Sequence, residues 1–325
     1  WRRAVSAAPH GIRAVTAALD GSSAVVEVST ALTGTADSVT YELADAEGQV
    51  LATAEGLGTV QLAANGITPW TPETPALYTL RVTVTANGTA DTAEQRIGIR
   101  TIQVSSKTGL LLNGQPRTMK GGCIHHDLGI LGAADHAAAE RRRIRLMKES
   151  GFDAIRAAHN PFGPAFLDAC DELGMLVVEE AFDEWVMGRT SFGLHVTFEQ
   201  CWEKDLEDMI TRDYNHPCIV MWSTGNEVEE RDGTADGFAW AKRLANKVRS
   251  LDASRPVSAT GLRALLGIRQ PPRRRYHRQP RTESAQSRGL FRPRRWRGGR
   301  PSGAKRRFCL RLPACRGPFQ RCFCS

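Results

Sequence analysis

The chain has 325 residues, which is enough for two or three domains, and its formal net charge is +8 at pH 7. It contains no run of about 18 apolar residues and no apolar core near its start, so neither a membrane span nor a signal peptide is expected. The charge is unevenly spread, because residues 261–325 hold 18 Arg and one Lys against a single acid, Glu283. The rest of the chain is therefore an acidic, enzyme-like body, and it is joined to this basic tail.

Four of the eight cysteines lie in that tail, and the other four are Cys123, Cys170, Cys201 and Cys218. These four are widely spaced, and three of them stand in apolar surroundings. Such spacing predicts free thiols rather than a disulfide framework. Unpaired thiols favour the cytoplasm over an oxidising compartment.

Residues 12–104 have the pattern of an antiparallel β-sandwich. They are rich in Val, Thr and Ala, and turn signals separate short alternating runs such as AVVEVST, SVTYELA and YTLRVTVTA. Trp70 and Tyr78 are expected to pack in a core rather than to bind a ligand. Since nothing in this region has a catalytic pattern, the chemistry is expected further along the chain.

From Leu110 onwards the pattern changes to alternating strands and helices. Apolar strand patterns occur in TMKGGCIHH, FDAIRAA, MLVVEEAF, CIVMWSTG and RPVSATG, and helical patterns separate them. This alternation predicts a parallel sheet with crossover helices. Because the segment has no glycine-rich phosphate loop, an incomplete (β/α)8 barrel over residues 105–261 fits better than a nucleotide-binding sheet.

Polar residues follow four of the expected strands at their C-terminal ends, where a barrel places its active site. They are His125, His126 and Asp127, then Arg156, His159 and Asn160, then Glu179, Glu180, Asp183 and Trp185, and finally Asn226 and Glu227. Such a pocket suits a polyhydroxylated ligand, since polar groups bind hydroxyls and an indole face packs on a sugar ring. On position alone, Glu227 is equally a catalytic acid or base and a first-turn charge of the next helix.

Two segments of this region resemble the signatures of glycoside hydrolase family 2, which contains β-galactosidases, β-glucuronidases and β-mannosidases. They are RAAHNP with FLDACDELGMLVV, and DYNHPCIVMWSTGNE. PWTPETPALYTL and then RIGIRTIQV resemble the passage from the sandwich to the barrel, and LLLNGQPRTMKGGCIHHD resembles the first barrel strand. Asn160 and Asp153 depart from the signature, which usually has Tyr and Asn there. The resemblance implies an immunoglobulin-like β-sandwich before a TIM barrel, with residues 1–11 as the remnant of a preceding jelly-roll domain.

The resemblance also implies an activity, that of a retaining exo-β-glycosidase acting on a terminal β-linked sugar. β-Galactosidase is preferred, with β-glucuronidase or β-mannosidase as the alternatives. Glu227 would be the general acid and base, Asn226 would bind the sugar 2-hydroxyl, and Arg156 would keep a nucleophilic carboxylate ionised. The remaining sugar-binding residues would be His125, Asp127 and His159. Retention requires a second carboxylate about 5 Å from the first, which would raise the pKa of the acid.

No cofactor is expected, and a metal site at the first strand end is not favoured. Cys123, His125 and Asp127 would be its ligands, but they lack the usual zinc spacings. His126 should face away from His125 and is read as structural. Family members often assemble as oligomers, so a homo-oligomer stays open for a full-length protein.

Residues 262–325 form an irregular basic tail that breaks the barrel pattern. Periodicity and acids are lost together there, which favours a shifted reading frame over an arm that binds nucleic acid. The family's nucleophile should follow a later strand, but Glu283, the only acid after Asp252, lies among arginines. With no initiating Met either, the chain is expected to be an inactive fragment of a longer protein. A non-catalytic carbohydrate-binding module and a nucleic-acid-binding protein are the alternative classes.

Overall fold

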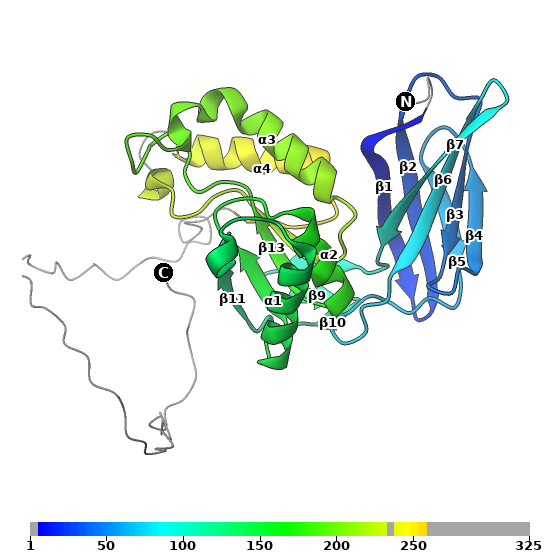
Figure 1. Ribbon diagram of the computed structural model, residues 1–325, viewed down its shortest axis with the longest axis horizontal. Coiled ribbons are helices and arrows are strands. Elements are labelled where there is room, and N and C mark those ends of the chain that lie inside the picture. Colours follow the sequence, from blue (N-terminus) through cyan, green and yellow to red (C-terminus); the bar gives the residue numbers. More distant parts are fainter. Residues whose placement is uncertain (1–5, 233–236, 259–325) are drawn as a thin grey trace, which may run out of the picture. The chain divides into compact units, whose positions relative to one another are not determined.

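The computed structural model describes residues 6–232 and 237–258, which form an antiparallel sandwich followed by a parallel sheet with helices (Figure 1). The Arg-rich tail and Glu283 lie outside the described residues. None of the helices in the described part is long and apolar enough to cross a membrane.

The sandwich consists of two antiparallel sheets around a shared core. In β3 and β6, every second side chain is buried, as the two-residue period of a strand requires; Tyr41 and Leu43 lie opposite Val82 and Leu80. The first sheet contains β1 (Ser6–Asp20), β2 (Ser23–Thr33) and β5 (Val60–Ala64). The second contains β4 (Val50–Glu55), β3 (Ser38–Ala44), β6 (Tyr78–Ala86) and β7 (Thr89–Ile97). The sandwich predicted from the alternating pattern is confirmed, and β1 also includes residues 6–11.

Trp70 and Tyr78 are packing residues, as predicted. The Trp70 side chain is fully buried, and its Nε1 donates to the Asp171 carbonyl oxygen at 3.0 Å. The Tyr78 hydroxyl oxygen accepts a hydrogen bond from the Thr68 backbone N–H at 2.8 Å. Trp70 packs in the core of the parallel sheet rather than in the sandwich core, so it ties the two regions together.

A small antiparallel sheet, which the sequence pattern did not predict, comes between the sandwich and the parallel sheet along the chain. Its strands are β8 (Ile102–Ser105), β9 (Gly109–Leu112) and β10 (Gln115–Pro116). Asn113 and Gly114 both have positive φ, as a two-residue turn between β9 and β10 requires.

The parallel sheet has five strands in chain order, each of which lies within the segment predicted for it, and a helix stands between each strand and the next, as predicted. The strands are β11 (Gly121–Ile124), β12 (Ala154–Ala157), β13 (Leu176–Glu180), β14 (Ile219–Ser223) and β15 (Val257–Ser258). An order that never reverses fits a barrel rather than a doubly wound sheet. Within the described residues the sheet is not closed, since β11 and β15 are its edges.

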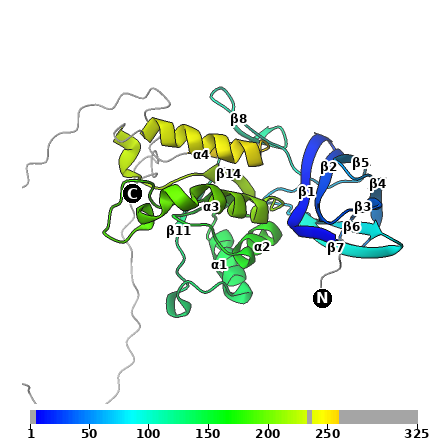
Figure 2. The ribbon, with the colours of Figure 1, turned by 90° about the horizontal axis from the view of Figure 1, so that it is seen from above.

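Four helices connect these strands and pack in pairs, α1 beside α2 and α3 beside α4 (Figures 1 and 2). They are α1 (Ala137–Glu149), α2 (Pro164–Leu173), α3 (Phe198–Asp213) and α4 (Gly237–Leu251), with short 3-10 helices at Gly129–Leu131, Leu194–Val196 and Glu229–Asp232. Helix α2 begins with Pro164 and ends at Leu173, and it is capped by Gly174, whose φ is 72°. Glycine is required there, because a Cβ would collide with the Pro72 carbonyl.

A buried ion pair fixes the approach to β15. Asp252 and Arg255 are 1% and 6% exposed, and Arg255 NH1 lies 2.6 Å from Asp252 Oδ2. Trp222 Nε1 donates to the same oxygen at 2.7 Å, and Arg255 Nε donates to the Ile219 carbonyl at 2.9 Å. The pair therefore connects the end of α4 to β14 through groups that are almost completely shielded from water.

Asp252→Asn is expected to lower the free energy of unfolding at pH 7 by about 2 kcal/mol. Burial alone would raise the pKa of Asp252, but the Arg255 charge and hydrogen bonds from Ser254 and Trp222 lower it to about 2. A carboxyl whose folded pKa is depressed stabilises the fold above its unfolded pKa, and this contribution disappears as the pH falls from about 4 to 2. Urea unfolding at pH 7 and pH 3 tests this, with the exposed Asp208→Asn as the control; equal losses in the two variants would contradict it.

Candidate active site

The ends of three neighbouring strands bring one polar group of residues together. Arg156 lies in β12, Glu180 is the last residue of β13, and Asn226 follows β14. Glu180 pairs in register with Ser223 of β14. Parallel strands end at the same edge of a sheet, so side chains from all three meet there.

A partly exposed Arg156 and a buried Glu180 form an ion pair at the centre of this group. Arg156 NH2 donates to Glu180 Oε1 and Oε2 at 2.7 Å each, and Arg156 Nε donates to Oε2 at 3.1 Å. The fully buried Glu180 carboxylate also accepts from the His159 backbone N–H at 2.8 Å and from the Ser223 hydroxyl at 2.7 Å. Burial would lower the pKa of Arg156, but the Glu180 carboxylate raises it above its ordinary value. Glu180 is thus fully occupied in holding the guanidinium and the adjoining loop.

Asn226 connects the Arg156–Glu180 ion pair to a second carboxylate, that of Asp183. Asn226 Oδ1 accepts from Arg156 NH2 at 2.8 Å, and Asn226 Nδ2 donates to Asp183 Oδ1 at 3.1 Å. His159 Nδ1 lies 2.7 Å from the same Asp183 oxygen, and its ring stacks on His125 with the ring centroids 4.7 Å apart. These polar side chains therefore form one continuous network.

Glu227 comes directly after Asn226 and is exposed. Its φ of 28° lies in the left-handed region, which residues other than glycine seldom adopt. The preceding Gly225 packs closely on Trp185, since a Cβ there would lie 2.7 Å from Trp185 Nε1. Backbone strain of this kind is held in place by surrounding packing and is often found at functional sites.

A cleft with a volume of about 550 Å³ adjoins the network. This volume lies within the usual range of small-ligand sites. Arg189 forms an ion pair with Asp183 in the cleft, and the Glu184 carboxylate accepts the backbone N–H groups of Arg189 and His195. The cleft is lined by His159, Asn160, Asp183, Glu184, Arg189, Thr190, Gly193 and Leu194.

Two predicted positions lie apart from the network. Asp127 is exposed, its Oδ1 accepts from the Gly129 backbone N–H at 2.8 Å, and it lines other cavities beside Leu128. The expectation that Trp185 offers an indole face to a sugar is wrong. That side chain is 2% exposed, and its Nε1 donates to the Thr224 carbonyl at 2.8 Å.

His126 has a packing role, as predicted, because its ring stacks on Phe162 with the ring centroids 4.0 Å apart. Burial and the nearby Arg143 charge lower the pKa of His126. Sequence reasoning missed Arg189 altogether, since it lies far from any strand end. The only sequence signal for Arg189 was that an Arg stands in the loop that follows a strand with an acidic end.

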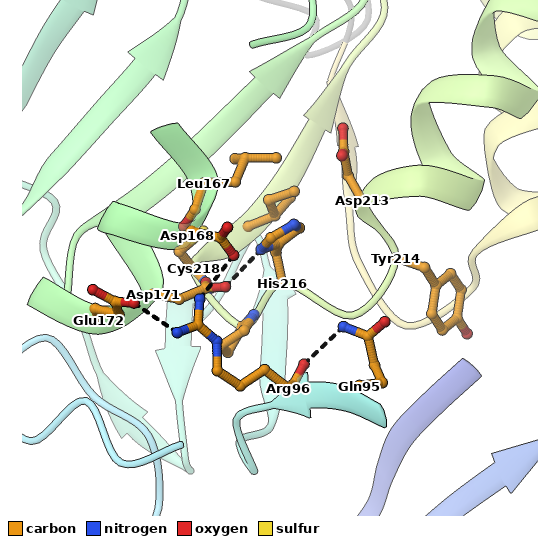
Figure 3. A network of polar contacts seen from close by, with 12 residues as sticks. Gln95, Arg96, Leu167, Asp168, Asp171, Glu172, Asp213, Tyr214, His216 and Cys218 are labelled. Atoms are coloured by element: carbon orange, nitrogen blue, oxygen red, sulfur yellow. Dashed lines mark hydrogen bonds and ion pairs between the residues drawn. The ribbon is translucent and has the colours of Figure 1, made fainter. Parts of the chain in front are cut away.

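A second cluster, Asp171, His216 and Cys218, places three potential metal ligands within 4.8 Å of one another (Figure 3). Asp171 Oδ2 lies 2.6 Å from His216 Nδ1, and Asp171 Oδ1 accepts from the Cys218 backbone N–H at 3.0 Å. Burial raises the pKa of the Cys218 thiol well above its ordinary value, which makes it a poor ligand. Both carboxylate oxygens are already used, so the cluster fits a structural role in joining α2 to β14.

Known proteins match both regions of the chain. Residues 12–100 match the family described as "Glycosyl hydrolases family 2", and residues 102–280 match "Glycosyl hydrolases family 2, TIM barrel domain". The β-galactosidase BoGH2A of Bacteroides ovatus is 35% identical over 295 residues, covering 77% of this chain and 35% of that protein. A β-galactosidase of Vibrio cholerae is 31% identical over 246 residues, covering 69% of this chain and 23% of that protein.

Solved structures of the same family are also similar. A family 2 member from Bacteroides cellulosilyticus has a TM-score of 0.73 and 34% identity, covering 79% of this chain and 36% of that one. A β-D-glucuronidase from Dictyoglomus thermophilum has a TM-score of 0.67 and 27% identity, covering 76% and 43%. The chain thus spans less than half the length of these relatives. With matches to both family domains, the chain belongs to glycosyl hydrolase family 2.

Proposed function

We propose that the described residues contain the general acid/base and part of the sugar subsite of a retaining exo-β-glycosidase of the β-galactosidase type. The observation that supports this most is the Asn226–Glu227 pair after β14, with Asn226 held by Arg156 and Asp183. We interpret the five parallel strands as the first five of an eight-stranded barrel.

In this mechanism Glu227 acts twice at the glycosidic bond. As a carboxylic acid it protonates the leaving oxygen while a second carboxylate attacks the anomeric carbon and forms a glycosyl-enzyme. As a carboxylate it then removes a proton from the water that releases the sugar. The nucleophile is expected in the chain beyond β15, where Glu283 lies outside the described residues.

The remaining residues bind and orient the sugar. Asn226 donates to the 2-hydroxyl, and Arg156 keeps the nucleophile ionised through its positive charge. His125 and His159, stacked on each other, line the sugar subsite, and family resemblance proposes Asp127 for the same subsite.

A neutral sugar suits the described cleft better than a uronic acid. The Arg156 guanidinium in the network is paired with Glu180, and that of Arg189, which lines the cleft, is paired with Asp183, so each of these two guanidinium groups already has a carboxylate partner. A sugar carboxylate would have to compete with a protein carboxylate for either one. This favours β-galactosides over β-glucuronides, in agreement with the activity named for the Bacteroides ovatus relative.

The test begins with the coding DNA across residue 262, sequenced and translated in three frames. The longest product that continues the β-α pattern is then assayed with 4-nitrophenyl β-D-galactoside and β-D-glucuronide. We expect nitrophenolate release from the galactoside to have the higher kcat/KM. Hydrolysis of neither substrate would contradict the proposal, and saccharide binding without hydrolysis would favour a carbohydrate-binding module.

A further inference from the structure

Asp183 lies at the junction of the polar network, although it follows β13 on a loop. Its Oδ1 accepts from Asn226 Nδ2 at 3.1 Å and lies 2.7 Å from His159 Nδ1. The side chain is 42% exposed and lines the cleft, where Arg189 forms an ion pair with it. Asp183 therefore contacts two proposed sugar-binding residues while remaining beside the ligand space.

The contacts of Asn226 leave one orientation for its amide. A guanidinium only donates hydrogen bonds and a carboxylate only accepts them. Asn226 Oδ1 therefore faces Arg156, and Asn226 Nδ2 faces Asp183. The second N–H of Nδ2 is left to donate to a sugar hydroxyl.

The same reasoning fixes the tautomer of His159. Since Asp183 is an acceptor, His159 Nδ1 carries a proton, so whenever the ring is neutral its lone pair is on Nε2. Burial would raise the pKa of Asp183, but hydrogen bonds from Arg189 and Asn226 lower it, so the carboxylate stays anionic at neutral pH. The backbone of His159 has a left-handed φ of 78°.

We propose that Asp183 is a positioning residue that sets the donor and acceptor pattern of the sugar subsite. Together with Arg156 it makes Asn226 present an N–H to the sugar hydroxyls, and it makes the neutral His159 ring present its Nε2 lone pair to them. The inference rests on the proposed function, because it assumes that a pyranose occupies the cleft.

Two imino sugars, which are basic amines without a carboxylate, separate this role from a merely structural one. A galacto-configured 1-deoxynojirimycin keeps the hydroxyl that corresponds to the sugar 2-hydroxyl, whereas the isofagomine of the same configuration lacks it. Their Kd values are measured by calorimetry with the full chain and with Asp183→Ala and Asp183→Asn. In Asp183→Ala we expect the deoxynojirimycin to lose about tenfold more affinity than the isofagomine, the loss of one well-oriented hydrogen bond.

The variants provide their own controls. Asp183→Asn keeps an acceptor oxygen and should stay within about threefold of the unsubstituted chain for both probes. Asn226→Ala should show the same selective loss as Asp183→Ala, and the double variant should lose no more than either alone. Asp208→Ala, on the exposed face of α3, should change neither Kd.

Two outcomes separate failure of this inference from failure of the proposed function. Equal losses for both probes in Asp183→Ala, or no loss, would overturn the positioning role while leaving a sugar site in place. Binding of neither probe by the unsubstituted chain would overturn the proposed function and this inference together.

Discussion

Replacing Glu227 with Gln is expected to lower kcat/KM for aryl β-galactosides with poor leaving groups by about 10² to 10⁴. Glutamine keeps the size of the side chain but has no proton to give to the leaving oxygen. A substrate with a very acidic leaving group, such as 2,4-dinitrophenol, needs little protonation and should be affected much less. Steady-state rates for a series of aryl galactosides with the longest active product measure this dependence on leaving group.

The matched control is Glu229→Gln, because Glu229 is exposed and only two residues further along the chain. It should leave the rates unchanged. Added azide should restore turnover of the dinitrophenyl substrate by Glu227→Gln, since azide attacks the glycosyl-enzyme without needing a base. A uniform loss across all leaving groups would instead mean that Glu227 acts in binding or folding.

The strands and helices of the parallel region were predictable because short apolar runs, bounded by turn signals, alternate with helical patterns. The run CIVMWSTG, for example, contains β14 and is bounded by polar turns, so both ends of the strand could be located. The sheet formed by β8, β9 and β10 was not predictable, because its strands have two to four residues and show no period.

The candidate site was predictable only as far as the strands themselves reach. Arg156 and Asn226 meet because parallel neighbours end at one edge of the sheet. Beyond a strand, the loop backbone decides where a side chain points. Trp185 turns into the core to reach the Thr224 carbonyl, while Arg189, still further along the same loop, returns to Asp183.

Arg156→Ala is expected to lower the free energy of unfolding by about 3 to 5 kcal/mol, apart from any effect on catalysis. Glu180 has no exposed surface, and Arg156 supplies three of the hydrogen bonds that satisfy its carboxylate. Without the guanidinium, a buried anion keeps only the Ser223 hydroxyl and the His159 N–H. Equilibrium unfolding in urea at pH 7, followed by tryptophan fluorescence and circular dichroism, measures the loss.

A double-variant cycle shows whether the loss of stability in Arg156→Ala comes from the unpaired charge of Glu180. Arg156→Ala with Glu180→Gln removes both charges, and it should be more stable than Arg156→Ala alone because no uncompensated carboxylate remains. Arg156→Lys keeps the positive charge but cannot place two nitrogens on the Glu180 carboxylate. Its stability should therefore fall between those of the unsubstituted chain and Arg156→Ala. If the double variant is instead less stable than Arg156→Ala, then Glu180 stabilises the loop at His159 and Ser223 by itself, and Arg156 serves the sugar site rather than the fold.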